Sequence, residues 1–101
     1  MALVQPIAAF DWDDGNWPKC GKHGVSKADI EHALSHEPMV RPDRTEGGEP
    51  RFNAIGPNAS GRHLFIAFAI REVDGRTMIR PISARFMHRK EIVHYEQSKR
   101  P

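Results

Sequence analysis

The apolar and polar positions predict a helix near residue 30 and a run of strands in the second half of the chain. From residue 26 to about residue 36, apolar residues recur at helical spacing. Ser26 is a natural N-cap, and Asp29 stands in the capping-box position three residues later. Pro38 cannot continue the helix. We expect Val25 and Ile30 to form a hydrophobic staple around the cap. The buried stripe of this helix is expected to consist of Ile30, Ala33 and Leu34.

The second half of the chain has the pattern of antiparallel strands. Arg62–Arg71 is nearly continuously apolar, which is typical of a central strand covered on both faces. Val73–Arg76 supplies hairpin chemistry, with Gly75 free to adopt a positive φ. Thr77–Phe86 is then the returning strand, and Arg51–Gly56 is a short strand before the central one.

The remaining segments have weaker patterns. We expect an edge strand interrupted at Pro6 over Ala2–Trp12, turns and at most a short helix over Asp13–Gly24, a loop over Pro38–Pro50, and a helix over His88–Lys99. Ile92 and Tyr95 are the expected inward residues of that last helix. Together the elements predict an α+β fold, with a small antiparallel meander of three to four strands, an N-terminal edge strand and helices at both ends.

Length and composition favour one ordinary globular domain. A chain of 101 residues provides material for one core, so a single domain over residues 1–101 is expected. Cys20 is the only cysteine, which excludes an internal disulfide and fits a reducing compartment. Met1–Ala9 lacks the basic leader of a signal peptide, and no apolar stretch approaches the roughly 20 residues of a membrane span. We therefore expect a cytoplasmic protein.

Charge is distributed unevenly between the halves. Residues 1–50 carry five Lys/Arg against nine Asp/Glu, whereas residues 51–101 carry ten Lys/Arg against four Asp/Glu. Eight of those ten cations are arginines, whose planar guanidinium binds phosphate or carboxylate through two hydrogen bonds. The second half therefore suits a polyanionic partner. The alternative is that the two halves neutralise each other across the fold.

The last predicted strand, R-P-I-S-A-R-F from Arg80 to Phe86, carries candidate chemistry. Pro81 cannot donate a hydrogen bond to the sheet, so we expect a β-bulge there, and one extra residue resets the alternation of faces. With the bulge, Arg80, Ser83 and Arg85 share one face. The opposite, apolar face is expected to hold Ile79, Ile82, Ala84 and Phe86. We expect two arginines at the starts of the preceding strands to reach the cationic face, namely Arg51 and Arg62.

Two sets of histidines need separate interpretations. His32 and His36 are four residues apart, the spacing of a metal pair on a helix. However, His32 lies about 200° around the helix from Ile30 and no third ligand accompanies the pair, so a solvated face is favoured. His23 follows Lys22 at the foot of the capped helix, where a positioned imidazole suits proton transfer. A structural hydrogen bond is the alternative role for His23.

Five motifs follow one another along most of the chain. They are F-D-W-D at Phe10–Asp13, K-H-G-V-S at Lys22–Ser26, G-E-P-R-F at Gly48–Phe52, Arg62 at the start of an apolar strand, and I-S-A-R at Ile82–Arg85. In this order and spacing the chain resembles the BrnT family of bacterial type II toxins. It departs from the family's pattern in having Gly15, Pro18 and Gly21 where a charged helix is usual, and Pro50 where a second acidic residue is common.

The resemblance implies a fold and a function. It implies a RelE-like ribonuclease toxin, neutralised by a BrnA-like antitoxin with a ribbon-helix-helix DNA-binding domain, and operator DNA bound only through the toxin–antitoxin complex. No metal and no cofactor are expected, because nothing in the sequence has the pattern of a metal site or a phosphate-binding glycine loop.

Metal-free RNA cleavage needs cations for the charge on phosphorus and groups that transfer protons. The candidate catalytic residues are His23, Glu49, Arg51, Arg62, Arg80 and Arg85. The candidate RNA-binding residues are Lys22, Trp12 and Ser83, with core packing as the favoured alternative for Trp12. The rival function is a non-catalytic module that binds nucleic acid or protein through the same basic face.

Overall fold

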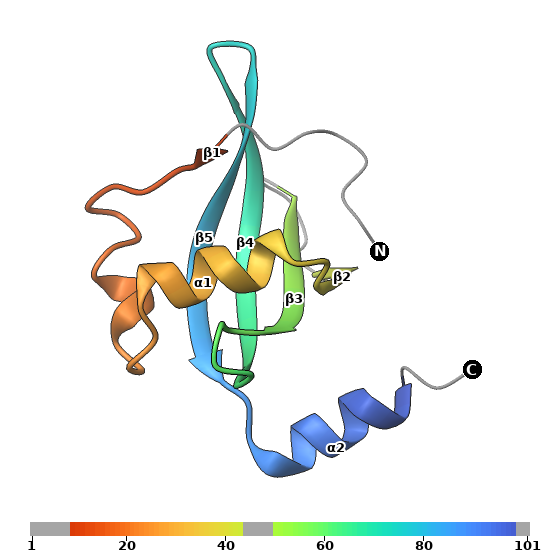
Figure 1. Ribbon diagram of the computed structural model, residues 1–101. Helices are drawn as coiled ribbons and strands as arrows, with labels where there is room; N and C mark the ends of the chain where they lie inside the picture. Colours follow the sequence, from red (N-terminus) through yellow and green to blue (C-terminus); the bar gives the residue numbers. More distant parts are fainter. Residues whose placement is uncertain (1–8, 44–49, 99–101) are drawn as a thin grey trace.

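A computed structural model describes residues 9–43 and 50–98, which form a five-stranded mixed sheet with one helix across a face and another beyond one end of the strands (Figure 1). The strands are β1 (Ala9–Phe10), β2 (Met39–Pro42), β3 (Arg51–Pro57), β4 (His63–Val73) and β5 (Arg76–Phe86). Their order across the sheet is β1-β5-β4-β3-β2, with β1 parallel to β5 and every other pair antiparallel. The α+β prediction is confirmed, as is the N-terminal edge strand for its described part, whereas residues 2–8 lie outside the described residues.

Helix α1 (Lys27–Ser35) begins where the capping box places it. The Asp29 backbone N–H donates to Ser26 Oγ at 3.0 Å, and the Ser26 N–H donates to Asp29 Oδ2 at 3.1 Å. That backbone N–H at Ser26 is the main reason why the pKa of Asp29 is lowered. Ile30, Ala33 and Leu34 are the buried residues of the helix, as the pattern predicted. Before α1 the described chain has only a short 3-10 turn, η1 (Lys19–Gly21), rather than a second α-helix.

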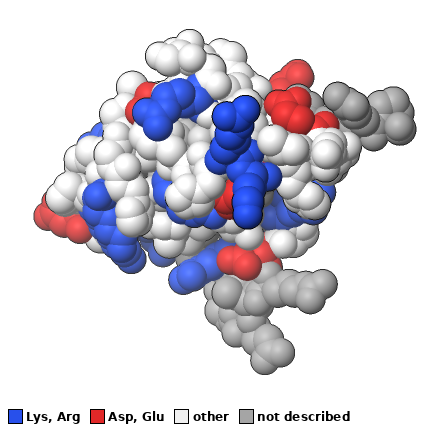
Figure 2. Space-filling view, turned by 90° about the horizontal axis from the view of Figure 1, so that it is seen from below, with Lys and Arg blue, Asp and Glu red and all other residues white. Residues whose placement is uncertain are grey.

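Helix α2 (Arg89–Ser98) lies at one end of the sheet, on the side opposite to α1 (Figure 1). Tyr95 is its buried residue and Ile92 is half-buried, which agrees with the predicted inward side. Seen from the end of the molecule where α2 lies, Lys and Arg side chains are spread widely, with Asp and Glu interspersed among them (Figure 2). Within the described residues, neither helix has the length and apolar character needed to cross a membrane.

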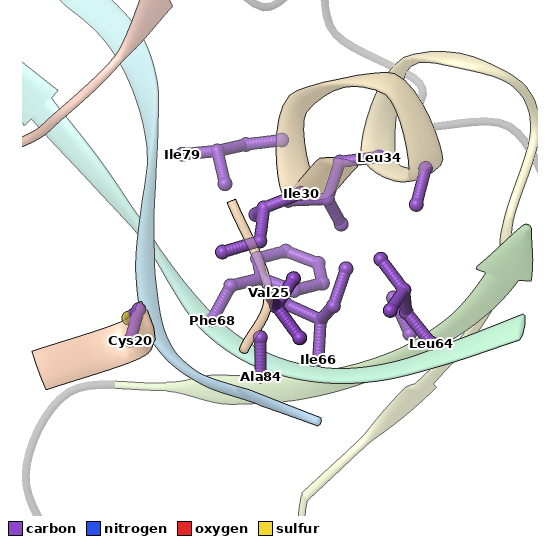
Figure 3. Close-up of a cluster of buried hydrophobic side chains, with 11 residues drawn as sticks. Cys20, Val25, Ile30, Leu34, Leu64, Ile66, Phe68, Ile79 and Ala84 are labelled. Atoms are coloured by element: carbon purple, nitrogen blue, oxygen red, sulfur yellow. The ribbon is translucent and has the colours of Figure 1, made fainter. Parts of the chain in front are cut away.

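The core lies between α1 and one face of the sheet (Figure 3). Alternation along β4 points Leu64, Ile66 and Phe68 toward α1, and each is 0% exposed. Ala54 of β3 and Ala84 of β5 flank Ile66 in the same row, and both are buried. Val25 and Ile30, the expected staple, are buried in the same cluster. These contacts bury the middle of this face of the sheet.

The other face of the sheet, called here the open face, is covered only in part. Phe65 and Ala67 point to it and are half-buried, so the expectation that the central strand is covered on both faces is wrong along this stretch. The reason is that α2 lies beside one end of the open face, not along it.

The hairpin at the far end of β4 and β5 is confirmed. Asp74 and Gly75 both have positive φ, at 52° and 77°, as a two-residue type I′ turn requires. By contrast, the loop predicted over Pro38–Pro50 is wrong at its start. Met39–Pro42 is strand β2, which pairs with Phe52–Ile55 of β3 and ends at Pro42, where an edge strand tolerates proline.

The bulge in β5 is confirmed, with one correction. Ala67 faces Ser83 and Phe68 faces Pro81, so Ile82 is the extra residue. Pro81 is buried opposite Phe68, in the place where Ile82 was expected on the apolar face. Arg80, Ser83 and Arg85 therefore share the open face, as predicted.

Replacing Ser26 tests the cap of α1. Ser26→Ala removes the acceptor for the Asp29 N–H, and we expect the free energy of unfolding to fall by about 1 kcal/mol. Urea unfolding followed by circular dichroism measures the change. Ser35→Ala, at the exposed last residue of α1, is the matched control and should change stability much less. Equal effects of the two substitutions would contradict the role of the cap.

Candidate functional site

Three arginines surround one small residue on the open face. Arg51 of β3 and Arg80 of β5 are both opposite Ala69, the β4 residue between them. Arg71 is two residues further along β4 and therefore points to the same face. Ala69 is buried and has only a methyl side chain, so the long side chains around it enclose a space instead of filling it.

That space is a polar hollow of about 160 Å³. Its charged lining residues are Lys19 of η1 and the three arginines around Ala69. This volume is well above what a single water molecule needs. It is therefore open enough to receive a small anionic group such as a phosphate. We call it the cationic hollow.

Arg80 is held from one side by two carboxylates. Its Nη1 and Nη2 donate to Asp13 Oδ2 and Oδ1 at 3.0 and 2.9 Å, and Nη1 also donates to Asp11 Oδ2 at 3.3 Å. These bonds lower the pKa of Asp13 and raise that of Arg80, whose side chain is only 14% exposed. Arg71 Nη1 lies 3.9 Å from Asp11 Oδ2. The guanidinium of Arg80 is therefore fixed in position and remains charged.

The segment that carries these aspartates is anchored by Asn16, which is 3% exposed. Asn16 Nδ2 donates to the carbonyl oxygens of Asp11 and Pro81, both at 2.9 Å, and its Oδ1 accepts from the Asp13 N–H at 2.8 Å. The anchor thus ties the N-terminal segment to the bulged strand, directly beside Arg80.

Gly15 allows the close approach between this segment and Arg80. Its N–H donates to Asp13 Oδ1 at 2.7 Å, which is a further cause of the lowered pKa of Asp13. A Cβ at Gly15 would lie 2.8 Å from Arg80 Nη2 and 3.0 Å from Asp13 Oδ1. Glycine therefore permits the ion pair to form beside the turn.

The described part of the site has a surplus of positive charge. Four cations line the cationic hollow, and two carboxylates, Asp11 and Asp13, balance part of that charge. Two of these cations, Lys19 and Arg51, are exposed. Such an arrangement attracts an anion without leaving a partly buried guanidinium unpaired.

Arg85 shares the open face but is directed to α2. Its Nη1 and Nη2 donate to Glu91 Oε1 and Oε2 at 2.7 and 2.8 Å, and its guanidinium lies 5.0 Å from the Phe65 ring centre. Arg85 is opposite Phe65 and Arg80 opposite Ala69, which separates their backbones by about 13 Å along the strands. The hydrogen bonds from Arg85, and then from the His88 N–H, lower the pKa of Glu91 to about 2.

Arg62 lies on the other side of the sheet. Its guanidinium is 3.7 Å from the ring centre of Phe86, which packs against the core under α1. The expectation that Arg62 joins Arg51, Arg80 and Arg85 at one surface is therefore wrong. The physical reason is the alternation of side chains along a strand. Arg62 is two residues before buried Leu64 and points to the same face, whereas the other three arginines point to the open face.

The remaining predicted residues lie around the site or apart from it. Ser83 is exposed on the open face, opposite Ala67 between the levels of Arg80 and Arg85. Lys22 and His23 are exposed after η1 and do not line the cationic hollow. Glu49 lies outside the described residues.

Trp12 packs toward α1. Its indole Nε1 donates to Glu31 Oε2 at 2.8 Å, its ring meets Trp17 edge-on at 5.5 Å, and the Lys27 ammonium lies 5.4 Å from it. These contacts support the packing role that was favoured for this residue.

His32 and His36 stack on each other, with ring centres 3.9 Å apart. His36 is exposed, but His32 is half-buried with Nδ1 3.4 Å from the Pro57 carbonyl oxygen, so the predicted solvated face is wrong for His32. Within residues 9–43 and 50–98, no three His, Cys, Asp or Glu side chains are grouped to hold a metal ion.

Sequence reasoning missed Lys19, Arg71, Asp11, Asp13, Gly15 and Asn16. For Arg71 the sequence did contain a signal, because it is two residues from Ala69 in β4 and alternation therefore places both side chains on the same face. For the other five residues, which lie between positions 11 and 19, no local sequence pattern indicates that they approach Arg80.

Comparison with protein families matches residues 12–91 to the BrnT family, described as the ribonuclease toxin of type II toxin–antitoxin systems. The matched region runs from the N-terminal segment of the site through β5 to the first residues of α2. Comparison with curated proteins finds no match.

Gly15→Ala tests the packing at Arg80. Because the added Cβ would lie 2.8 Å from Arg80 Nη2, we expect the guanidinium to shift and affinity for single-stranded RNA to fall by about tenfold, the loss of roughly one charged hydrogen bond. RNA binding is measured by fluorescence anisotropy at fixed salt, with circular dichroism as the check on folding. Gly61→Ala adds a Cβ in open space at a φ of 84°, so it controls for general destabilisation by a glycine substitution that does not approach Arg80. Unchanged RNA affinity in Gly15→Ala would contradict the arrangement.

The Arg85–Glu91 pair predicts a pH dependence of stability. The folded pKa of Glu91, about 2, lies below its ordinary value of 4.5, so the pair's contribution is present above about pH 4.5 and is lost as the pH falls toward 2. The stability difference between wild type and Glu91→Gln should therefore shrink over that range. Urea unfolding at several pH values measures the difference, with Glu72→Gln on the exposed hairpin as the control. A difference that stays constant down to pH 2.5 would contradict the ion pair.

Proposed function

Because this protein belongs to the BrnT family of ribonuclease toxins of type II toxin–antitoxin systems, we propose that it cuts RNA at the cationic hollow, without a metal ion. The observation that carries this proposal is the gathering of Lys19, Arg51 and Arg80 around the small side chain of Ala69. The hollow lies on an open sheet face, which a flexible single strand can cross.

The proposed reaction is attack of a ribose 2′-hydroxyl oxygen on the adjacent phosphorus. The new P–O bond forms as the bond to the 5′ oxygen breaks, which leaves a 2′,3′-cyclic phosphate and a 5′-hydroxyl. Negative charge builds up on the phosphoryl oxygens in the transition state, and guanidinium groups that already face those oxygens stabilise it. Arg51 and Arg80 hold this position in our proposal.

Arg80 retains donors for this role. Its three hydrogen bonds to Asp11 and Asp13 use three of the five N–H groups of a guanidinium. We assign the other two to phosphate oxygens. The aspartates then act as positioning residues, because they fix the guanidinium before RNA arrives.

Proton transfer is assigned to His23 and Glu49. His23 is exposed and follows Lys19, a lining residue of the hollow, by four positions. Glu49 precedes Arg51 by two residues, and a chain of that length spans at most about 7 Å. Either group is thus tied through the chain to a residue that lines the hollow.

The family also supplies the partner class, since a type II system includes an antitoxin. We propose that the antitoxin is BrnA-like, with a ribbon-helix-helix domain, and that the complex binds operator DNA through that domain. We further propose that the sheet and helices are RelE-like in arrangement and that the toxin acts in the cytoplasm.

Substitution of the two arginines tests the proposal. Arg51→Ala and Arg80→Ala should each lower the cleavage rate of single-stranded RNA in EDTA by about 100-fold, the loss expected when one donor to a charged transition state is removed. Arg80→Lys should fail to restore full activity, because an ammonium cannot replace the planar fork. Arg76→Ala, at the exposed hairpin, is the matched control and should keep wild-type activity.

Two results would argue against this function. Wild-type protein that binds RNA in a salt-dependent way but leaves it intact would support the non-catalytic binding module instead. Growth arrest in bacteria that persists in folded Arg51→Ala and Arg80→Ala would place the active residues elsewhere.

A further inference from the structure

A second and larger hollow lies on the open face, between α2 and the ends of β2, β3 and β4. Its volume is about 500 Å³, and its polar lining includes Asn53 of β3 and Ser98 of α2. The apolar side chains that line it are Met39, Ile55, Phe65, Met87 and Tyr95. We call it the α2 groove. None of its lining residues belongs to the cationic hollow.

The lining of the α2 groove suits protein side chains better than nucleobases. Phe65 lies under the Arg85 guanidinium at 5.0 Å, and Tyr95 is buried edge-on to His63 at 5.4 Å. Recognition of single-stranded RNA uses aromatic faces that are open to stack on bases, and Arg85 and His63 already lie against these two rings. Two methionines supply adaptable apolar surface, as grooves that receive apolar side chains of a partner commonly have.

The rim of the groove is positively charged. Arg41, Lys90 and His94 line it, and within the described residues Arg41 and Lys90 form no ion pair. Glu91 is the acidic residue of the lining, and both of its carboxylate oxygens bind Arg85. The groove therefore complements a segment that combines apolar side chains with Asp or Glu.

The groove and the cationic hollow are neighbours on one face. Asn53 lines the groove and Arg51 lines the hollow, and these two residues are separated by about 7 Å along β3. A chain that fills the groove and continues along the sheet meets Arg51 next. Occupation of the groove is therefore a direct way to keep RNA off the face.

From these observations we propose that the α2 groove is the docking site of the antitoxin, which places an acidic, apolar segment there and blocks the path of RNA. The inference rests on the proposed function, which supplies the antitoxin and the RNA path. The charge of the rim and the open apolar lining specify the chemistry of the segment.

The test uses the full-length toxin and the protein encoded by the neighbouring open reading frame, the expected antitoxin. The double variant Arg41→Glu/Lys90→Glu should weaken antitoxin binding at least tenfold by isothermal titration calorimetry, and Met87→Ala should weaken it as well. Arg89→Glu is the matched control, because it reverses a charge on the same helix outside the groove, and its affinity should stay within twofold of wild type. All variants should keep wild-type RNA cleavage.

Two outcomes argue against the docking site. Wild-type antitoxin affinity in both groove variants would overturn the inference. Loss of RNA cleavage with unchanged antitoxin binding would assign the groove to RNA and overturn it too. If wild-type toxin cuts no RNA, the proposed function fails, but the calorimetry still decides whether the antitoxin occupies the groove.

Discussion

The β-bulge in β5 is the constraint on which the candidate site depends. If the same residues paired with β4 without a bulge at Ile82, strict alternation would place Arg80 and Arg85 on opposite faces of the sheet. One guanidinium would then enter the apolar layer under α1, where an unpaired charge costs several kcal/mol. Pro81 makes the irregularity tolerable because it has no N–H to leave unsatisfied, and its carbonyl oxygen accepts a hydrogen bond from Asn16. The bulge therefore places Arg80 and Arg85 on the same face of the sheet. It also provides the carbonyl oxygen to which Asn16 anchors the N-terminal segment beside Arg80.

The carboxylates at Arg80 explain how a cationic hollow persists without a ligand. A guanidinium that is only 14% exposed requires partners, and Asp11 and Asp13 provide them. Asp13 is charged at neutral pH, and because the hydrogen bonds from Arg80 lower its pKa it stays charged in more acidic solution than an ordinary Asp. Exposed Arg51 and Lys19 leave the hollow with net positive charge, so an anion is attracted to a geometry that already exists. Preorganised donors of this kind stabilise developing charge without a reorganisation cost at the moment of reaction.

The sequence predicted best the features that depend on neighbouring residues. The capping box at Ser26, the Asp74–Gly75 turn and the bulge at Pro81 all follow from local hydrogen bonding and φ preferences. The alternation of side chains would also have separated Arg62 from the other arginines. Leu64, two residues later, is buried under α1, so Arg62 points to that same face. The Asp13–Arg80 pair was beyond reach, since it joins residues 67 positions apart through a loop anchored by one buried amide. Strand β2 was missed because its only support is a partner strand, which local composition does not reveal.

Geometry also separates the two arginines that alternation placed together. For Arg85 to bind a phosphate it must leave Glu91, and Glu91 also accepts the His88 N–H at 2.8 Å at the start of α2. Breaking that pair would leave the Glu91 carboxylate without its guanidinium partner, and a bidentate pair of this type is among the stronger ionic contacts. Arg80 faces no such conflict, because its aspartates bind one side of the guanidinium and leave donors for a ligand. We therefore infer that Arg85 serves the open face chiefly by holding α2 in place, which preserves the groove, while Arg80 meets the RNA.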